Sequence, residues 1–354
     1  MGRKTTGAGT MGAENKKEPE RELAAAVRLF WPDYEGTTER GASGWNNTTR
    51  FVARAGRRYV LRVYETHRDR SRIEFEQAVL RELAGLPLSF CTPVPVKTAD
   101  GADIAELSDG RYACLFGYIE GVRPGDEDAR IFRGLGEAAG ELSAALARIR
   151  LPLKPAYRPY YELEAAYPLC AREAVEAFCA RPPAELAEAR AELNILAAAY
   201  GEIVGELEVL RRLPHQLVHG DLNASNVLVG GGAPGEIAAL LDFEFCTYDV
   251  RAMEAAVVLS ALPEPDASEA GEEWAETARS FCLGWQQSVP LTGEEIAALP
   301  LLMRLRKVDV FLHFLTRYLE GVEGPDALLK IVRPLCAELR TIENREREIK
   351  NFFN

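Results

Sequence analysis

Oxygen-donor side chains with the spacing of a phosphoryl-transfer site are the most informative feature of the sequence. The segment His219-Gly220-Asp221 is followed by Asn226, five residues after the aspartate, and Asp242 comes after a glycine-rich stretch. At such sites one aspartate accepts the proton of the acceptor hydroxyl, while an asparagine five residues later and a second aspartate beyond a hairpin bind metal ions. Positioning and charge provide most of the catalysis there. The spacing therefore predicts Asp221 as the catalytic base and Asn226 and Asp242 as metal ligands.

Short apolar runs beside these residues predict the elements that position them. Residues 226–229 form an apolar run directly after the loop, and a second run follows over residues 237–241. The glycine-rich segment 230–235 between them is typical of a hairpin turn. Such a hairpin would return Asp242 to the side of Asn226.

The tripeptide His-Gly-Asp alone also has a simpler explanation, a tight turn capped by an aspartate. Asn226 at the required offset and Asp242 beyond a hairpin favour the catalytic interpretation. His219 is expected to brace the loop by packing and hydrogen bonding. A metal-dependent hydrolase that uses His219 and Asp221 is a further alternative, although only His215 lies near a ligand spacing to His219.

Length and composition indicate a two-lobed enzyme of the cytoplasm. The chain has 354 residues, of which 47% are apolar, enough to bury two cores. A formal net charge of −12 argues against nucleic acid or an anionic membrane surface as a partner. No stretch approaches the ~20 apolar residues of a membrane span, and the seven cysteines include no CxxC pair, so we expect reduced, mostly buried thiols. The oligomeric state stays open.

The loop with Asp221 and Asn226, the segment 240–244 and the order of the other elements resemble the aminoglycoside phosphotransferase superfamily of small-molecule kinases, which includes the type II homoserine kinases. The resemblance covers roughly residues 36–320. It implies an α+β, bilobal protein-kinase-like fold, with a small lobe of antiparallel sheet plus helix and a large, mostly helical lobe. It also implies ATP and Mg²⁺ as cofactors. The domains expected on this basis are a flexible leader (1–19), an N-terminal nucleotide-binding lobe (20–117) and a C-terminal catalytic and substrate-binding lobe (118–354).

The predicted small lobe begins with an amphipathic helix over residues 20–30 and continues as strands from Thr37. A turn over residues 41–50 carries Asn46 and Asn47, and small and polar residues of this kind let backbone amides approach phosphates. The functional interpretation is a phosphate-covering loop. An ordinary hairpin turn would have the same composition.

A strand cation and a helix acid complete the nucleotide site that the resemblance implies. Arg62, on the predicted strand 58–64, stands where related kinases usually have the lysine that contacts the α- and β-phosphates. Arginine and lysine are not interchangeable in general, and a solvent-facing arginine on an edge strand is the alternative. Glu76, in the predicted helix 72–83, aligns with the glutamate that pairs with this cation, and Glu74 is the second candidate.

The segment 116–121 is the expected hinge between the lobes. The resemblance implies that its backbone contacts the adenine, which makes Phe116 and Tyr118 nucleotide-binding candidates, although Tyr118 is equally well explained by packing. Beyond it the chain has helical periodicity broken by prolines. Asp249 is expected to be the N-cap of a helix that follows it.

The acceptor is expected to be a small molecule with a hydroxyl group, such as homoserine, an amino alcohol or an aminoglycoside. Segments in the C-terminal third loosely resemble type II homoserine kinases, which favours a homoserine-like acceptor. A non-catalytic nucleotide-binding or interaction module derived from such kinases is the alternative, suggested by the arginine at position 62 and the unusual phosphate loop. Candidates for lining the acceptor site are Glu244, Trp285, Arg304, His313 and Arg317.

Overall fold

The computed structural model describes residues 18–41, 47–65, 69–125, 131–232, 235–262 and 270–353. The chain forms two compact units, one of Met1–Arg81 with Pro93–Ile119 and the other of Glu82–Thr92 with Glu120–Asn354. Residues 82–92, assigned to the N-terminal lobe from the sequence, pack with the second unit. The expected leader lies outside the described residues except for its last two positions. Within the described ranges, no helix is long and apolar enough to cross a membrane.

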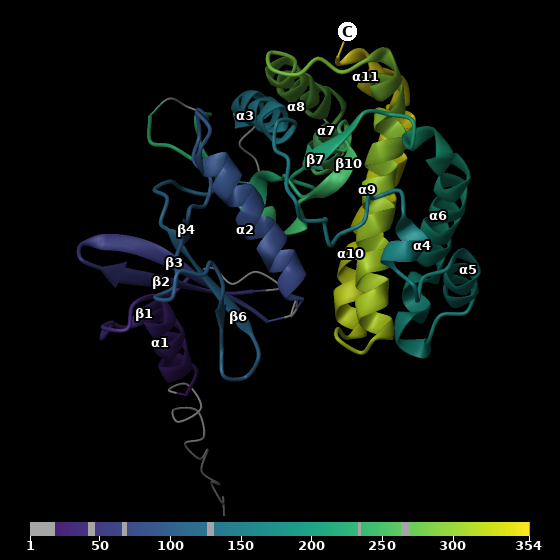
Figure 1. Cartoon of the computed structure of the whole chain (residues 1–354). Coiled ribbons are helices and arrows are strands. Elements are labelled where there is room, and N and C mark those ends of the chain that lie inside the picture. The colour runs from purple at the N-terminus through teal and green to yellow at the C-terminus, as the bar shows by residue number, and fades with distance from the viewer. Residues whose placement is uncertain are drawn as a thin grey trace, which may run out of the picture. The chain divides into compact units, whose positions relative to one another are not determined.

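The first unit is built on an antiparallel sheet (Figure 1). Helix α1 (Glu18–Phe30) buries Leu23, Val27 and Phe30 in a core shared with the sheet, which confirms the amphipathic helix predicted there. In the part of the unit that the structure describes, the strand order is β1-β2-β3-β6-β4, with β5 paired to β6. The strands are β1 (Thr38–Arg40), β2 (Asn47–Arg54), β3 (Arg57–Tyr64), β4 (Pro95–Val96), β5 (Ala105–Glu106) and β6 (Tyr112–Gly117).

Helix α2 (Arg70–Ala84) follows β3 and confirms the second helix predicted in this region. Its apolar residues Phe75, Val79 and Leu83 are buried, as their spacing along one face predicts. Strand β3 lies inside the sheet between β2 and β6. The alternative of an edge strand for Arg62 is therefore wrong.

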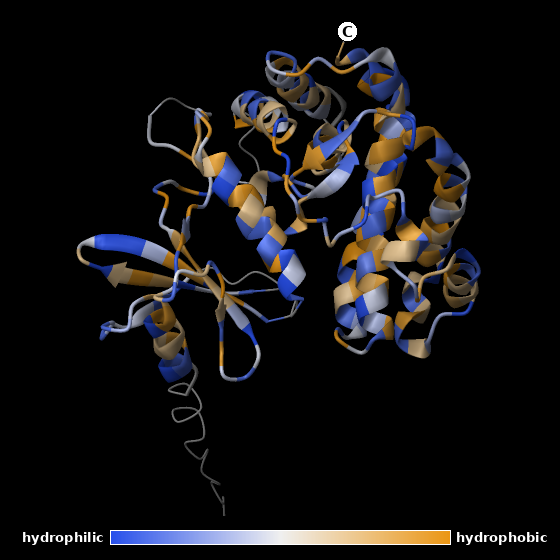
Figure 2. Ribbon diagram, viewed as in Figure 1, coloured by the Kyte–Doolittle hydropathy of each residue, from blue (hydrophilic) through white to orange (hydrophobic). Residues whose placement is uncertain are grey.

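The second unit is mostly helical, and its longest helix is α9 (Gly293–Leu319). Helices α6 (Arg190–Leu210) and α10 (Pro325–Asn344) pack alongside α9 (Figure 1). A capping box formed by Thr292 and Glu295 begins α9. Apolar and polar residues alternate around this helix, as expected for a helix between a core and a polar surface (Figure 2). The other helices are α3 (Ile131–Leu146), α4 (Leu163–Ala166), α5 (Arg172–Ala180), α7 (Met253–Ser260), α8 (Ala270–Trp285) and α11 (Glu346–Asn351).

Two short antiparallel strand pairs interrupt the helices of the second unit. Strands β8 (Val227–Val229) and β9 (Ile237–Leu240) form the hairpin predicted after the loop. Strand β7 (His215–Val218) pairs with β10 (Thr247–Val250). The prediction that Asp249 caps a helix is wrong, because pairing with β7 keeps the backbone extended through Val250, and α7 begins only at Met253.

Candidate active site

The loop after β7 holds Asp221 in a sharp turn. Gly220 has φ +84°, and a Cβ at this position would lie 2.7 Å from the carbonyl oxygen of Phe245. His219 is fully buried, and its Nε2 donates to the carbonyl oxygen of Leu241 over 2.9 Å. The backbone N–H of Asp221 donates to Nδ1 of the same ring at 3.3 Å, which identifies Nε2 as the protonated nitrogen. The predicted bracing role of His219 is confirmed.

Glu254, on α7, holds the loop in place through a hydrogen bond to its backbone. Its Oε2 accepts the backbone N–H of His219 at 2.5 Å, and the side chain is buried. Burial raises the pKa of the Glu254 carboxyl, and the neighbouring His219 and its backbone N–H oppose that rise. The loop that carries Asp221 is thus held both to the end of β9 through Leu241 and to α7 through Glu254.

Asn226 is hydrogen-bonded directly to the candidate base, Asp221. Its Nδ2 donates to the backbone carbonyl oxygen of Asp221 at 2.9 Å and lies 3.4 Å from Oδ2 of the Asp221 carboxylate. The backbone N–H of Leu241 donates to the carbonyl oxygen of Asn226 at 2.8 Å, which continues the β8–β9 pairing and places Asp242 next along the chain. The hairpin therefore brings Asp242 back beside Asn226, as the sequence predicts.

Asp242 adopts an unusual backbone conformation for a residue with a side chain. Its φ of 64° and ψ of 66° are left-handed, and it immediately precedes the short 3₁₀ turn Phe243–Phe245. Aspartate tolerates this region better than most residues, and such conformations concentrate at functional sites. The strained position turns the chain sharply between the end of β9 and this turn.

Asn226 and Asp242 fit a hard cation better than a transition metal. Both offer side-chain oxygens, and because Asn226 uses Nδ2 to bond Asp221, its Oδ1 can act as a ligand. Mg²⁺ is commonly held by one or two protein oxygens, with phosphate oxygens and water completing its shell. Across the described ranges, no group of three or more His, Cys, Asp or Glu side chains could hold a metal ion. The hydrolase alternative therefore has no ligand set there.

Arg306 contacts the candidate base, although the sequence did not single it out. It lies on α9, and its Nη2 donates to Oδ1 of Asp221 over 2.5 Å. Its Nη1 donates to Oδ2 of Asp309 and to the hydroxyl of Tyr160, each at 3.1 Å. Burial raises the pKa of Asp221, and the positive charge of Arg306 opposes this rise. In the sequence, the spacing of Arg306 and Asp309 signals an ion pair between these two residues only, and it gives no indication of the contact with Asp221.

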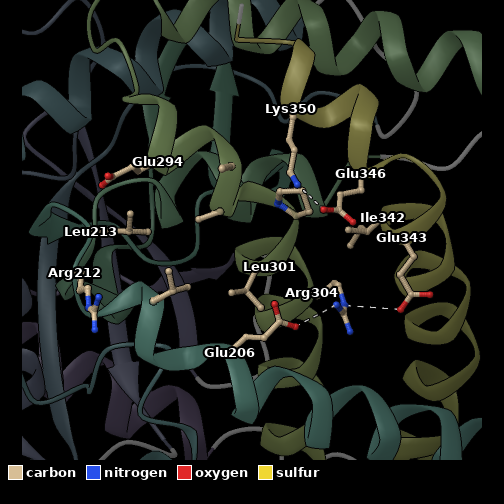
Figure 3. Close-up of a pocket in the computed structure, with 14 residues that line it drawn as sticks. Glu206, Arg212, Leu213, Glu294, Leu301, Arg304, Ile342, Glu343, Glu346 and Lys350 are labelled. Carbon is tan, nitrogen blue, oxygen red and sulfur yellow. Dashed lines mark hydrogen bonds and ion pairs between the residues drawn. The ribbon is translucent and has the colours of Figure 1, made fainter.

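Arg304 faces a different part of the unit. Residues two apart on an α-helix point to nearly opposite sides, so Arg304 points away from Arg306. It lines a cavity of about 640 Å³ between α6, α9, α10 and α11 (Figure 3). Its guanidinium approaches two glutamates of the cavity lining, Glu206 at 4.0 Å and Glu343 at 3.8 Å, and pairs with Glu202 at 2.7 Å. The structure gives Arg304 these glutamates as neighbours, whereas Arg306 contacts Asp221.

The other acceptor candidates lie in varied surroundings. Glu244 is buried in the turn directly after Asp242. Trp285 is fully buried at the end of α8, where its ring packs near Phe281. On α9, the His313 ring lies against Phe314, and Arg317 pairs with Glu323 at 2.9 Å. Their roles in acceptor binding stay predictions.

The first unit contains the predicted pair of Arg62 and Glu76. Nη1 of Arg62 lies 3.1 Å from Oε1 of Glu76, and the hydroxyl of Tyr64 donates to Oε2 at 2.7 Å. Glu76 is buried, whereas the second candidate, Glu74, pairs with Arg70 on the exposed side of α2. The structure therefore selects Glu76 as the partner of Arg62, and its nucleotide-binding role stays a prediction.

The remaining nucleotide candidates occupy the sheet and the chain beyond it. Asn46 lies outside the described residues, and Asn47 begins β2 opposite Tyr64. Phe116 is buried in β6. The Tyr118 ring meets Phe51 edge-on with centroids 5.5 Å apart and lies 3.7 Å beneath the Arg58 guanidinium. These contacts give Tyr118 a packing role, and the adenine contacts of Phe116 and Tyr118 stay predictions.

Comparison with known proteins identifies the family. A family model described as the phosphotransferase enzyme family matches residues 37–288. The chain belongs to this family. A homoserine kinase of Chelativorans sp. is 31% identical, over 89% of this chain and 90% of its own length. A homoserine kinase of Methylobacterium nodulans is also 31% identical, over 83% of this chain and 84% of its own. The predicted enzyme class, a small-molecule kinase that phosphorylates a hydroxyl group, is confirmed.

Solved structures of other kinases share the fold of this chain. An amicoumacin kinase in complex with AMP-PNP and Ca²⁺ aligns with a TM-score of 0.65 and 19% identity, covering 93% of this chain and 96% of its own. A microcompartment-associated aminopropanol kinase aligns with a TM-score of 0.65 and 18% identity, covering 93% and 98%. The predicted α+β, bilobal protein-kinase-like fold is confirmed.

Proposed function

We propose that the chain transfers the γ-phosphoryl group of ATP to the hydroxyl of homoserine, with Mg²⁺ as the cofactor. The observation that carries the proposal is the bond from Asn226 to the backbone carbonyl of Asp221, because it joins the candidate base and a candidate metal ligand in one loop. The homoserine kinases that match most of this chain support the choice of acceptor. A cytoplasmic location, as expected from the composition, would suit an ATP-dependent reaction.

Asp221 is the proposed general base. Its carboxylate accepts the proton of the acceptor hydroxyl as the hydroxyl oxygen forms a bond to the γ-phosphorus. The bond between that phosphorus and the bridging oxygen breaks at the same stage, and ADP leaves with the electron pair. His219 and Glu254 hold the loop still during this step through their bonds to Asp221 and to the backbone N–H of His219.

Asn226 and Asp242 are the proposed protein ligands of Mg²⁺. When bound, the metal ion would supply positive charge to neutralise the phosphate oxygens as their negative charge develops. The Asn226 amide is oriented for this role by its bond to Asp221, and the β8–β9 hairpin sets the position of Asp242. A non-catalytic module would have no need to retain this arrangement of base and ligands.

Arg62 is the proposed contact to the nucleotide phosphates. A guanidinium presents a planar set of donors that suits phosphate oxygens. Glu76 holds one end of that group at 3.1 Å, and Tyr64 holds Glu76 in turn. Glu76 and Tyr64 would therefore hold the Arg62 guanidinium toward the phosphates in one orientation.

The proposal is tested by acceptor-dependent ADP formation. Homoserine, 3-amino-1-propanol, choline and an aminoglycoside are compared at saturating ATP and Mg²⁺, with a chelated sample as the control and ³¹P NMR to identify the product. We expect the highest kcat/KM for homoserine and no turnover after chelation. A higher kcat/KM for another acceptor would refute homoserine as the substrate. Bound ATP without turnover of any acceptor would favour the non-catalytic module.

A further inference from the structure

A polar cluster beside the catalytic loop has no assigned role. It consists of Arg306 and Asp309 on α9 together with Tyr160 and Tyr167 from the segment that precedes α5. The hydroxyl of Tyr167 donates to Oδ1 of Asp309 at 2.7 Å, and Oδ2 of Asp309 accepts from Arg306. We call these four residues the Arg306 cluster. Its members come from segments more than a hundred residues apart, so the fold has brought them together at this place.

The cluster reaches the loop at two successive residues. Arg306 donates to Oδ1 of Asp221 at 2.5 Å, and the hydroxyl of Tyr160 donates to the carbonyl oxygen of Gly220 at 2.5 Å. The Arg306 guanidinium also lies 5.6 Å from the centre of the Tyr160 ring. One side chain of the cluster therefore fixes the backbone before the candidate base, and another fixes the carboxylate itself.

The guanidinium is itself held in place. Asp309 and Tyr160 both bind Nη1, which leaves Nη2 directed at Asp221. The side chains of Arg306 and Asp221 are each 20% exposed, so the pair is only partly open to water. Removing two charges from water is costly unless further hydrogen bonds support them, and here three hydrogen bonds from Nη1 and Nη2 hold the guanidinium in place.

We propose that Arg306 is a positioning residue for Asp221: by occupying Oδ1, it turns Oδ2 toward the hydroxyl of the acceptor. This inference rests on the proposed function, since it concerns the same base. Because Nη1 is bound by Asp309 and Tyr160, the rigid guanidinium gives the bond from Nη2 to Oδ1 a defined direction, which the rotating donors of a lysine ammonium would provide only in part. Helix α9, far from the loop in sequence, thereby sets the geometry of the transfer step.

The test compares Arg306→Gln and Arg306→Lys with Lys307→Gln. Lys307, the neighbouring cation on α9, is buried and pairs with Glu338 at 2.7 Å, so its loss controls for removing a positive charge from this helix. Steady-state kcat and KM are measured for ATP, homoserine and 3-amino-1-propanol, which is homoserine without its carboxylate. Thermal unfolding identifies variants that do not fold.

We expect Arg306→Gln to lower kcat about 100-fold for both acceptors, the loss typical of a small misplacement of a catalytic group, while KM for ATP is unchanged. Arg306→Lys should recover part of this loss, and Lys307→Gln should keep the parental kcat. If Arg306→Gln does not fold, Tyr160→Phe takes its place as the test. It removes the hydroxyl that is hydrogen-bonded to Gly220 and Arg306. We expect kcat to fall about tenfold, which corresponds to one lost interaction of about 1.4 kcal/mol.

Two results would overturn the inference. A parental kcat in the folded Arg306→Gln variant, or in Tyr160→Phe where that variant decides, would show that the loop needs no support from the Arg306 cluster. A loss confined to KM for homoserine, absent with 3-amino-1-propanol, would make Arg306 a ligand of the acceptor carboxylate instead. Failure of the proposed function is seen separately, because the parent enzyme itself would then form no ADP with homoserine.

Discussion

Replacing Gly220 with alanine is expected to lower both stability and activity. The residue has φ +84°, a conformation that costs a residue with a Cβ about 1–2 kcal/mol. The added Cβ would also lie 2.7 Å from the carbonyl oxygen of Phe245, a backbone atom that cannot rotate away. Overpacking of this kind typically costs about 1–3 kcal/mol. After subtracting the roughly 0.4–1 kcal/mol gained from a less flexible unfolded chain, the net loss is about 2–4 kcal/mol.

Gly321 provides a matched control in the same unit. Its φ is +70°, and no heavy atom beyond its chain neighbours lies within 4 Å of the position that a Cβ would take. Gly321→Ala should therefore lose about 1 kcal/mol, the backbone strain alone less the gain in the unfolded state. The difference between the two variants isolates the contact with Phe245.

Urea unfolding followed by circular dichroism measures the free energy of unfolding, and ADP formation measures kcat. Relief of the contact must move Phe245 or the Asp221 loop, so we expect Gly220→Ala to lose about 100-fold in kcat, whereas Gly321→Ala keeps the parental value. Equal free energies of unfolding for the two variants, with parental kcat in both, would refute the reasoning.

Two further predictions concern buried carboxylates. Burial raises the pKa of Asp249 from 3.8 to about 7, against the bonds from the backbone N–H groups of Tyr160 and Val250. Between these values the native state binds more protons than the unfolded state, so stability falls as pH rises from 4 to 7. Relative to the parent, Asp249→Asn should gain about 3 kcal/mol in the free energy of unfolding between pH 4 and pH 7, measured by urea unfolding, and a difference that does not change with pH would contradict this. Glu76→Gln should weaken the ion pair that holds Arg62 and raise KM for ATP about tenfold, while KM for homoserine stays unchanged. A tenfold change corresponds to the loss of about one charged hydrogen bond. An unchanged KM for ATP would count against a nucleotide-binding role for Arg62 and Glu76.

Local patterns were sufficient for the elements whose determinants lie close together in sequence. The apolar spacing of Leu23, Val27 and Phe30 predicted α1, and these residues fill the core of the first unit. The glycine-rich turn between two apolar runs predicted the β8–β9 hairpin, and with it the return of Asp242 to Asn226. Short-range chemistry determines such elements, so no knowledge of the rest of the fold was needed.

Contacts between segments that are distant in sequence could not be predicted from these local patterns. Arg306 lies 85 residues from Asp221, and only the packing of α9 brings the two together. Aspartate is a common N-cap residue, but the pairing of Asp249 with β7 keeps its backbone extended. The choice between Glu74 and Glu76 likewise depends on which side of α2 faces β3. In each case the missing information was the placement of one element against another.

The most direct test of the central claim compares Asp221→Asn with the parent enzyme in homoserine-dependent ADP formation, while the rise in melting temperature on addition of Mg²⁺-ATP reports nucleotide binding. Asparagine keeps the size of the side chain and removes its capacity to accept the proton. We expect the variant to lose about 10²–10⁴-fold in kcat, the usual contribution of a general base, and to keep the ATP-dependent stabilisation. Parental turnover in the folded variant would contradict the assignment of Asp221 as the base.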